Sequence, residues 1–157
     1  MNLLVGMALV LSLSAPVPQS DIKLEIGAKL DRKLIPRKII QITATSPGQL
    51  RPYIQRTIDG VTYIISFDEK TRKIKYIHTS DKNFRAANGL RVGSNISVAK
   101  NEIVSYPGWE IRAPITSDGW YPVVGYDMPK LGGISEDTFR KSDTAKLTVV
   151  GFSRGGN

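Results

Sequence analysis

The sequence has no cysteine and a single histidine, His78, among its 157 residues. Without cysteine the fold cannot contain a disulfide framework, so its stability has to come from packing and from sheet hydrogen bonds. The same absence excludes thiolate zinc sites, cysteine nucleophiles and a lipid anchor on an N-terminal cysteine. One histidine allows at most one Ser-His-Asp triad, and the sequence has no Gly-x-Ser-x-Gly elbow.

Other signatures of catalysis are also missing from the sequence. It contains no phosphate-cradling glycine loop and no cluster of metal-ligand residues. Asp59 and Asp118 both precede a glycine, and hairpin turns explain this spacing better than a pair of catalytic carboxylates. We therefore expect no catalytic residue, no metal and no cofactor, and we interpret the chain as non-enzymatic.

Long apolar runs are absent as well. The only apolar stretch, Leu3 to Leu13, is too short to span a bilayer. Small residues follow it at Ser14 and Ala15, so residues 1–15 are predicted to be a cleaved signal peptide, although its first residues carry no lysine or arginine. The mature domain would then be 16–157, exported to the periplasm or beyond the cell, with no transmembrane segment. A buried N-terminal strand or helix is the alternative.

Basic side chains outnumber acidic ones by 22 to 14, giving a net charge of +8. Such a field favours an anionic partner: an acidic protein, an anionic envelope polymer or lipid headgroups. The densest basic run comprises Lys29, Arg32, Lys33, Arg37 and Lys38. No aromatic residue interleaves with it, which argues against nucleic acid, and a merely solvated basic face stays open as an alternative.

Two pairs of segments resemble one another within the chain. Residues 57–68 align without a gap to 116–127, sharing a threonine, an Asp-Gly, two branched aliphatics, an aromatic and a closing aspartate. Residues 24–30 correspond to 90–96, each an apolar-x-apolar-Gly motif. Self-similarity in the same order predicts a tandem arrangement, with repeats at about 22–80 and 88–153 in one domain.

Each repeat is expected to be a short helix followed by strands. Leu30 and Leu34 before Pro36, and Ile96, Ala99 and Ile103 after a Ser94 cap, have helical spacing. Branched and aromatic runs predict strands at Ile39–Ala44, Tyr53–Ile58, Val61–Phe67, Lys73–Thr79, Trp109–Ala113, Gly119–Tyr126 and Lys146–Phe152. The predicted class is α+β, with short helices on one face of a joined antiparallel sheet. Residues 128–144 would form a long loop, either functional or disordered.

The second repeat is the richer in aromatic residues, which supply much of the binding energy at protein interfaces. The candidate binding residues are Tyr106, Trp109, Trp120, Tyr121 and Tyr126. Trp120 and Tyr126 align with Val61 and Phe67, so a core role is the alternative for both. Strand alternation places Tyr121 on the face opposite Trp120, which makes Tyr121 the better candidate for contact with a ligand.

The segment Asn88-Gly89-Leu90-Arg91-Val92-Gly93-Ser94-Asn95-Ile96 resembles the opening of the repeats in one fold group. That group contains the secreted β-lactamase inhibitory protein and the BamE-like lipoprotein of the outer-membrane assembly machine. The resemblance implies helix-plus-sheet units whose sheets join and whose free face binds another protein. The chain lacks the disulfides of the inhibitor and the lipid-bearing cysteine of the assembly factor.

Two functions remain open from the sequence. The first is a secreted or periplasmic protein-binding module of inhibitor or assembly-accessory type. Its partner would be another protein, and the positive net charge favours an acidic one. The alternative is an envelope-associated domain that binds anionic polymers or lipid headgroups through its basic surface. Salt dependence separates the two, because screening weakens electrostatic attachment far more than an aromatic interface.

Overall fold

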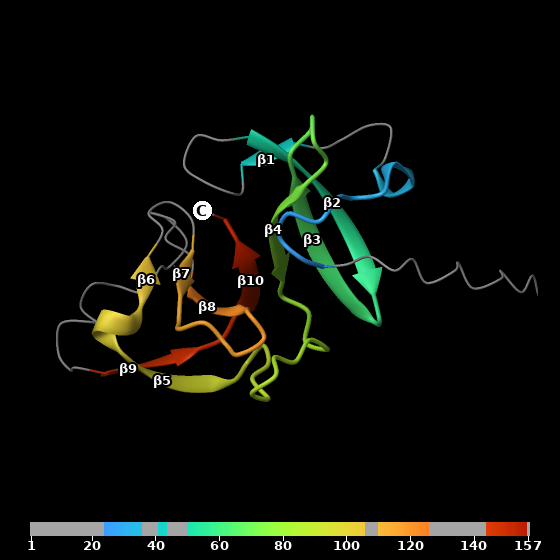
Figure 1. The fold of residues 1–157 in the computed structure, drawn as a ribbon. Coiled ribbons are helices and arrows are strands. Elements are labelled where there is room, and N and C mark those ends of the chain that lie inside the picture. Colours follow the sequence, from blue (N-terminus) through green and yellow to red (C-terminus); the bar gives the residue numbers. More distant parts are fainter. Residues whose placement is uncertain (1–23, 36–40, 44–49, 106–109, 126–143, 157) are drawn as a thin grey trace, which may run out of the picture.

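The computed structural model describes residues 24–35, 41–43, 50–105, 110–125 and 144–156. The predicted signal peptide and most of the 128–144 loop lie outside these residues. Ten strands and two short 3-10 helices make up the described part. In order they are η1 (Arg32–Leu34), β1 (Gln41–Thr43), β2 (Leu50–Ile58), β3 (Val61–Phe67), β4 (Ile74–Thr79), β5 (Asn95–Ala99), η2 (Lys100–Glu102), β6 (Val104–Ser105), β7 (Ile111–Arg112), β8 (Tyr121–Gly125), β9 (Thr144–Thr148) and β10 (Gly151–Gly155) (Figure 1).

Eight of these strands form one antiparallel sheet in the order β1-β2-β3-β4-β10-β8-β7-β6. The first four come from one half of the chain and the last four from the other, and they meet where β4 pairs with β10. In this central pair Ser153 lies opposite His78 and Phe152 opposite Thr79. Strands β5 and β9 form a separate two-stranded sheet, which lies beside β6, β7 and β8 in Figure 1.

The hairpin of β2 and β3 follows directly from its sequence. Asp59 and Gly60 have φ of 51° and 78°, and Ile58 pairs with Val61, so the loop is a two-residue turn with positive φ at both positions. That turn matches the twist of the flanking strands, and Asp-Gly is among its preferred sequences. The predicted Val61–Phe67 strand has the bounds of β3, and the predicted Asp59-Gly60 turn is confirmed.

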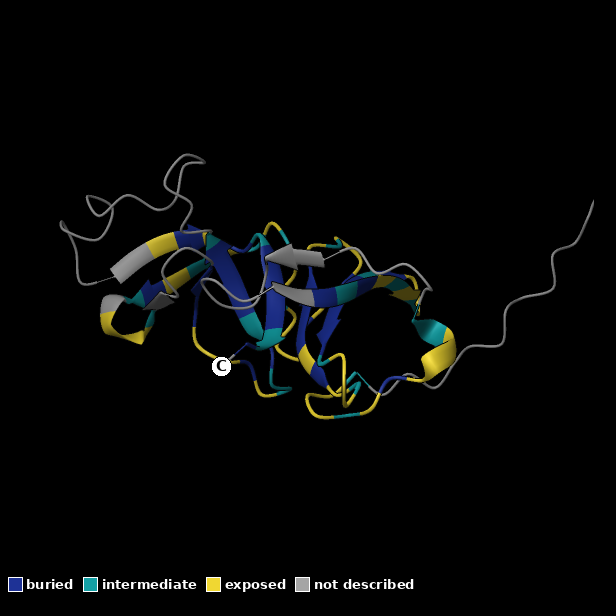
Figure 2. Ribbon diagram, turned by 90° about the horizontal axis from the view of Figure 1, so that it is seen from above, coloured by how far each residue is buried: buried dark blue, intermediate teal, exposed yellow. Residues whose placement is uncertain are grey.

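Two apolar clusters hold the sheet. The larger one joins alternate residues of β3, such as Tyr63, Ile65 and Phe67, to Ile77 of β4 and Phe152 of β10. The smaller one packs Val98 and Leu147 of the two-stranded sheet against Ile111, Ala113 and Val124 around β7 and β8. Figure 2 shows the buried residues along the strands and the exposed ones mainly in the connections.

The predicted α+β class is wrong, because the described residues form a mostly antiparallel β structure with only two 3-10 helices of three residues each. Where a helix was expected after Ser94, Asn95–Ala99 forms β5 and pairs with β9. The helical spacing of Ile96, Ala99 and Ile103 competes there with an alternation in which Ile96 and Val98 point inward. Pairing with β9 satisfies the backbone and decides in favour of the strand.

In the first half, the segment that was expected to be helical divides in two. Lys29 makes an isolated bridge to Lys73, and only Arg32–Leu34 winds into a 3-10 turn, capped by the Asp31 carboxylate on the Lys33 N–H at 2.9 Å. Short helices are marginal unless packing supports them, and η1 buries no residue.

A second correction concerns the predicted strand Lys146–Phe152. The chain leaves one sheet and enters the other at Val149 and Val150, so the stretch belongs to β9 and β10. The Asp118-Gly119 turn also differs from its counterpart. Gly119 N–H donates to Thr116 O at 2.9 Å and Thr116 N–H to Trp120 O at 2.7 Å, which makes a three-residue loop in place of the two-residue one.

Candidate functional site

A row of side chains crosses the sheet on the face opposite the larger apolar cluster. Register pairs Gln55 with Ile64, Ile64 with His78, His78 with Ser153, and Ser153 with Tyr121. We call these five residues the seam row. It joins both halves of the molecule through β2, β3, β4, β10 and β8. Gln55 is exposed, Ile64 and Tyr121 are half-buried, and His78 and Ser153 are buried, so the two ends of the row reach solvent.

A buried carboxylate holds the middle of this row in place. Glu110 is fully buried and accepts hydrogen bonds from Tyr76 Oη at 3.2 Å, Ser153 Oγ at 2.8 Å and Arg112 Nε at 2.5 Å. The second guanidinium arm, Arg112 Nη2, forms an ion pair with the same carboxylate. His78 Nδ1 lies 3.9 Å from Glu110 Oε2. We call Tyr76, His78, Glu110, Arg112 and Ser153 the Glu110 cluster.

The cluster follows the rule that buried charges are paired and hydrogen-bonded. Arg112 is 1% exposed and its guanidinium also lies over the Tyr121 ring, 5.1 Å from the ring centroid. Arg112 Nε and Nη2 both contact one oxygen of the carboxylate, Glu110 Oε1, and these two contacts fix the relative position of both groups. Because Tyr76 and Ser153 come from β4 and β10, the network also fixes these two strands against β7.

His78 is held as a neutral imidazole near neutral pH. Burial lowers its pKa below the ordinary value of 6.5; Glu110 opposes this effect and the positive charge of Arg112 adds to it. The ring lies against Gly151, where an added Cβ would meet His78 Cε1 at 2.9 Å. Glycine at this position therefore makes room for the imidazole.

A hollow of about 320 Å³ opens beside one end of the seam row. Its lining residues, mostly of polar type, are Gln55, Thr62, Ile64, His78, Thr79, Ser80 and Asp81. The Asp81 carboxylate accepts the Thr62 and Asn83 N–H groups, both at 2.9 Å, and these bonds lower the pKa of Asp81. These hydrogen bonds fix the positions of Thr62 and Asp81 in the hollow, so this part of its surface is preorganised.

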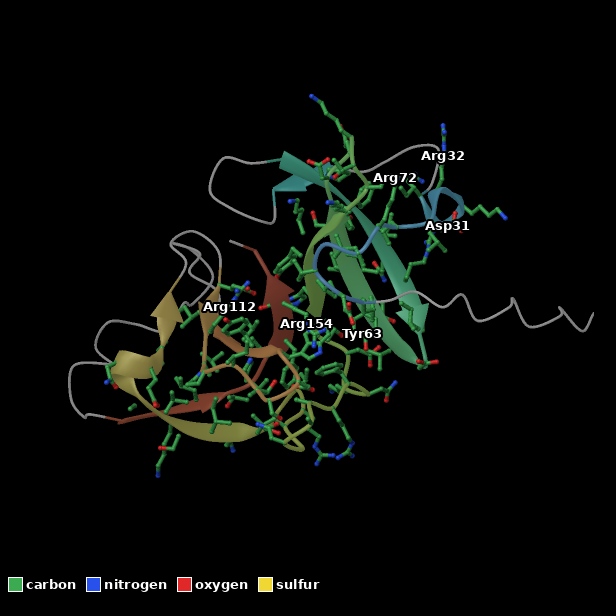
Figure 3. The ribbon with its side chains drawn as sticks, viewed as in Figure 1. Asp31, Arg32, Tyr63, Arg72, Arg112 and Arg154 are labelled. Atoms are coloured by element: carbon green, nitrogen blue, oxygen red, sulfur yellow. The ribbon has the colours of Figure 1, made fainter. Side chains whose placement is uncertain are left out.

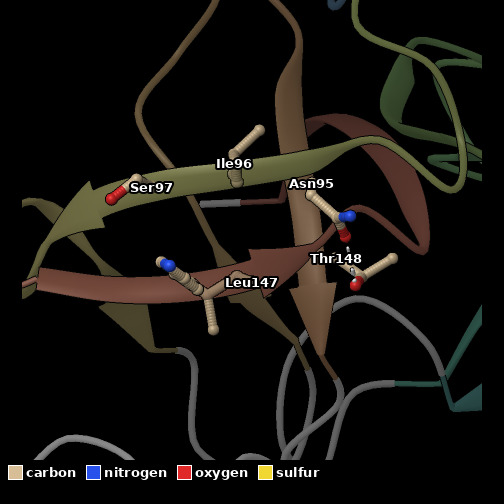
Figure 4. A pocket seen from close by; sticks show the side chains of 6 residues that line it. Asn95, Ile96, Ser97, Leu147 and Thr148 are labelled. Atoms are coloured by element: carbon tan, nitrogen blue, oxygen red, sulfur yellow. Dashed lines mark hydrogen bonds between the residues drawn. The ribbon is translucent and has the colours of Figure 1, made fainter.

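A larger hollow, of about 540 Å³, lies on the two-stranded sheet (Figure 4). Its lining is Asn95, Ile96, Ser97, Lys146, Leu147 and Thr148. Asn95 and Thr148 bond to each other across the strands at 2.9 Å. Lys146 is the one charged residue of this lining, and, unlike the smaller hollow, this hollow contains no residue of the seam row.

The structure places two of the five predicted binding residues. Trp120 lies in the core, with its ring centroid 4.9 Å from that of Phe84 and 6.1 Å from that of Tyr63, and the Arg154 guanidinium covers it at 4.7 Å. Tyr121 lies on the opposite face, under Arg112. Tyr106, Trp109 and Tyr126 lie outside the described residues.

Sequence reasoning missed the Glu110 cluster. The signal was present, since Glu110 and Arg112 alternate with Ile111 and Ala113 and so give one strand a polar and an apolar face. The burial of the polar face could not be deduced, because the partners of Glu110 come from strands 34 and 43 residues away.

In chemical terms the cluster positions groups and does not present a nucleophile. Ser153 is fully buried, and its hydroxyl donates to Glu110. Within the described residues, no group of three or more His, Cys, Asp or Glu side chains is arranged to hold a metal ion. The same part of the chain has no helix long and apolar enough to cross a membrane.

Comparison with known proteins adds no relative. No family model matches the chain, and neither the curated proteins nor the solved structures contain a match.

Proposed function

We propose that this chain is a non-enzymatic module that binds another protein at the seam row and the hollow beside His78. The observation that carries the proposal is the seam row itself. It crosses five adjacent strands, a buried hydrogen-bonded network fixes its middle, and its two ends reach solvent. A preorganised surface loses little entropy on binding, which favours a specific complex.

The residues at and next to the ends of the row carry groups that contact proteins well. Tyr121 offers an aromatic ring held by Arg112, and Ile64 offers an apolar side chain beside Gln55 and Thr62. Tyrosine is enriched among the residues that dominate interface energies. The net charge of +8 favours an acidic protein as the partner.

Two further expectations support this function. The resemblance of 88–96 to the inhibitor and assembly-factor repeats implies a free sheet face that binds a protein. The apolar segment Leu3–Leu13 is consistent with export, which would put the partner in the periplasm or outside the cell.

Duplication of one unit forms part of the proposal. Its support is geometric. Gly27 N–H donates to Ile74 O, and Ile74 N–H to Ala28 O, both at 2.8 Å; Gly93, Val149 and Ser94 repeat the pair of bonds at the same distances. The strand orders of the two halves also mirror each other about the β4-β10 pair. A doubled unit gives the seam row its two solvent-reaching ends.

The test is affinity capture with the wild-type chain and two folded variants. Gln55→Ala/Tyr121→Ala removes both ends of the row, and Lys82→Ala/Ser97→Ala is the control at exposed positions elsewhere. We expect one partner to be retained in high salt by wild type and control but not by the row variant. The purified partner should then bind with an affinity reduced at least tenfold by the row variant.

Two results would overturn the proposal. One is equal retention of every captured protein by the row variant and the control. The other is turnover of a substrate by the purified wild-type chain, since a non-enzymatic module has no activity.

A further inference from the structure

Two lysines of the first half face each other across a short antiparallel contact. Leu30 N–H donates to Arg72 O at 3.0 Å and Ile74 N–H to Ala28 O at 2.8 Å, which leaves Lys29 and Lys73 as the pair between these bonds. In such non-hydrogen-bonded pairs the two side chains approach most closely. Like charges placed opposite each other destabilise a sheet. Both lysines are exposed, so packing of the core does not require lysine at either position.

More cations surround the pair. The two segments that meet here, 29–33 and 68–75, form a surface that we call the basic end. Its seven cationic residues are Lys29, Arg32, Lys33, Lys70, Arg72, Lys73 and Lys75, against the three acidic residues Asp31, Asp68 and Glu69. Figure 3 shows Asp31, Arg32 and Arg72 at the end of the molecule away from Arg112.

Two of those carboxylates serve the backbone. Asp31 accepts the Lys33 N–H at 2.9 Å. Asp68 accepts the Thr71 N–H at 2.7 Å and the Thr71 hydroxyl at 2.8 Å, and these bonds lower the pKa of Asp68. They close the turns that bring the lysines together, and the basic end keeps a net excess of four positive charges.

The backbone at Arg72 is a second sign that this surface is used. Arg72 has a φ of 60°, in the left-handed region where glycine is the relaxed residue, and its N–H donates to Asp68 O at 2.7 Å. A side chain at such a position costs folding free energy, and residues of this kind gather at functional sites. The chain has a cation where glycine would be the more stable choice.

An exposed apolar side chain lies at the same end. Ile26, in the turn that leads to Lys29, is 42% exposed and lies over Gly155, next to the backbone of Lys75. An isoleucine in the interfacial region of a bilayer would bury this surface. A soluble polyanion offers no apolar region to receive it.

From these observations we infer that the basic end attaches the protein to the headgroups of an anionic phospholipid bilayer. Five of the seven cations are lysines, which act as point charges in the field of a charged surface, whereas recognition of one phosphate favours the bidentate arginine. This surface is separate from the seam row, so the inference does not depend on the proposed function. The sequence left open an envelope-associated domain that binds anionic polymers or lipid headgroups. Here the binding surface is the basic end, and the ligand is the lipid headgroups.

The experiment is vesicle co-sedimentation of the full chain. Vesicles of phosphatidylcholine alone are compared with vesicles containing 30% phosphatidylglycerol, each at 50 mM and 500 mM NaCl. The test variant is Lys29→Asn/Lys73→Thr, which places the Asn95-Thr148 pair of β5 and β9 at the same position of the first half. Because the sheet already accommodates that pair, the variant should fold. The control Lys82→Asn/Lys146→Thr removes equal charge from exposed positions elsewhere.

We expect wild type to bind the anionic vesicles only, and mainly at low salt. Each lysine near a charged surface contributes about fivefold, so the test variant should bind about 25-fold more weakly, and the control no more than about threefold. Ile26→Ser should weaken binding severalfold while leaving the salt dependence unchanged, because it removes apolar burial and no charge.

Three outcomes would overturn the inference. The first is absence of wild-type binding to the anionic vesicles at low salt. The second is an equal loss by test and control variants, which would mean that net charge alone attracts the protein. In the third, Ile26→Ser changes nothing and soluble polyphosphate binds wild type with the same dependence on Lys29 and Lys73, which would assign the surface to a polyanion.

Discussion

The turns at Gly27 and Gly93, one in each half of the molecule, share a backbone arrangement and have different side chains beside them. Gly27 and Gly93 both have positive φ, of 85° and 91°, and each turn bonds to the strand that enters the large sheet. The next cross-strand pair is Lys29-Lys73 in one half and Asn95-Thr148 in the other. Glycine and the apolar residues thus determine the turn, while the exposed pair beside it can be charged or neutral without changing the backbone.

The inner polar face shows a second difference. In the first half the buried polar group on this face is neutral: the Ser66 hydroxyl donates to Pro52 O at 3.0 Å. The second half has the charged Glu110 and Arg112 on this face. The Lys29-Lys73 pair of the first half is therefore exposed, whereas the Glu110-Arg112 pair of the second half is buried, so variants of these two pairs should respond differently to salt and to pH.

The largest effect is expected at Glu110. Replacing Glu110 by leucine leaves the Arg112 guanidinium buried without its carboxylate, at a cost of about 3–5 kcal/mol in the free energy of unfolding. For comparison, Ser66→Ala, which removes a buried neutral hydroxyl of the first half, should cost about 1 kcal/mol. Urea unfolding measures both. The double variant Glu110→Leu/Arg112→Met should recover most of the loss, and equal costs for Glu110→Leu and Ser66→Ala would contradict the comparison.

The next effect is a dependence of stability on pH that arises from His78. Burial lowers the pKa of this imidazole, so the unfolded chain takes up the proton first as the pH falls. The stabilisation is fully present above the ordinary pKa of 6.5 and is lost below it. Unfolding followed from pH about 7.5 to about 5 should show this loss in wild type and not in His78→Gln. Asp68 and Asp81 do not confuse the result, because their lowered pKa values lie below 3.8. If lowering the pH reduces the free energy of unfolding equally in wild type and in His78→Gln, the proton that causes the loss binds to a group other than His78.

The matched turn glycines should give smaller and equal effects. No atom lies within 4 Å of a Cβ built at Gly27 or Gly93, so alanine meets only the cost of the left-handed backbone, about 1–2 kcal/mol in each case. Chemical unfolding of Gly27→Ala and Gly93→Ala measures it, with the exposed Ser97→Ala as control. A difference between the glycine variants of more than about 1 kcal/mol would show that the two turns are not equivalent.

The smallest effect is expected when the exposed pairs are exchanged. Lys29→Asn/Lys73→Thr removes a like-charge contact and should raise the Tm by about 1–3 °C at low salt, whereas Asn95→Lys/Thr148→Lys should lower it by a similar amount. Both shifts should shrink in 0.5 M NaCl, since salt screens exposed charges. Calorimetry at the two salt concentrations makes the measurement, and shifts that are independent of salt would rule out a charge effect.

Elements determined by neighbouring residues could be predicted from the sequence. The β2-β3 hairpin was predicted because two runs of branched and aromatic residues and the Asp-Gly turn between them indicate the same structure. The stretch after Ser94 was predicted to be a helix because its apolar residues have helical spacing. The same residues also fit the alternation of a strand, and only pairing with β9, some 50 residues later, decides between the two. Long-range pairing of this kind leaves little trace in the local sequence.

The functional surfaces show the same limit. Tyr121 could be assigned to the face opposite Trp120 by alternation alone. The Glu110 cluster required knowledge that β4, β10 and β7 lie together, and the Lys29-Lys73 pair joins residues 44 positions apart in the chain. The sequence revealed the charge of the basic run but not the second basic segment that faces it.

The central place of β10 has a consequence for how the protein is made. This strand follows all the other strands in the chain, yet it lies between β4 and β8 in the sheet. During synthesis the local hairpin of β2, β3 and β4 can form early, because contacts between near neighbours form fastest. Until Gly151–Gly155 has emerged, β4 and β8 each have an open edge, and open edges attract other chains. A nascent chain would therefore need its edges shielded until its last strand is inserted.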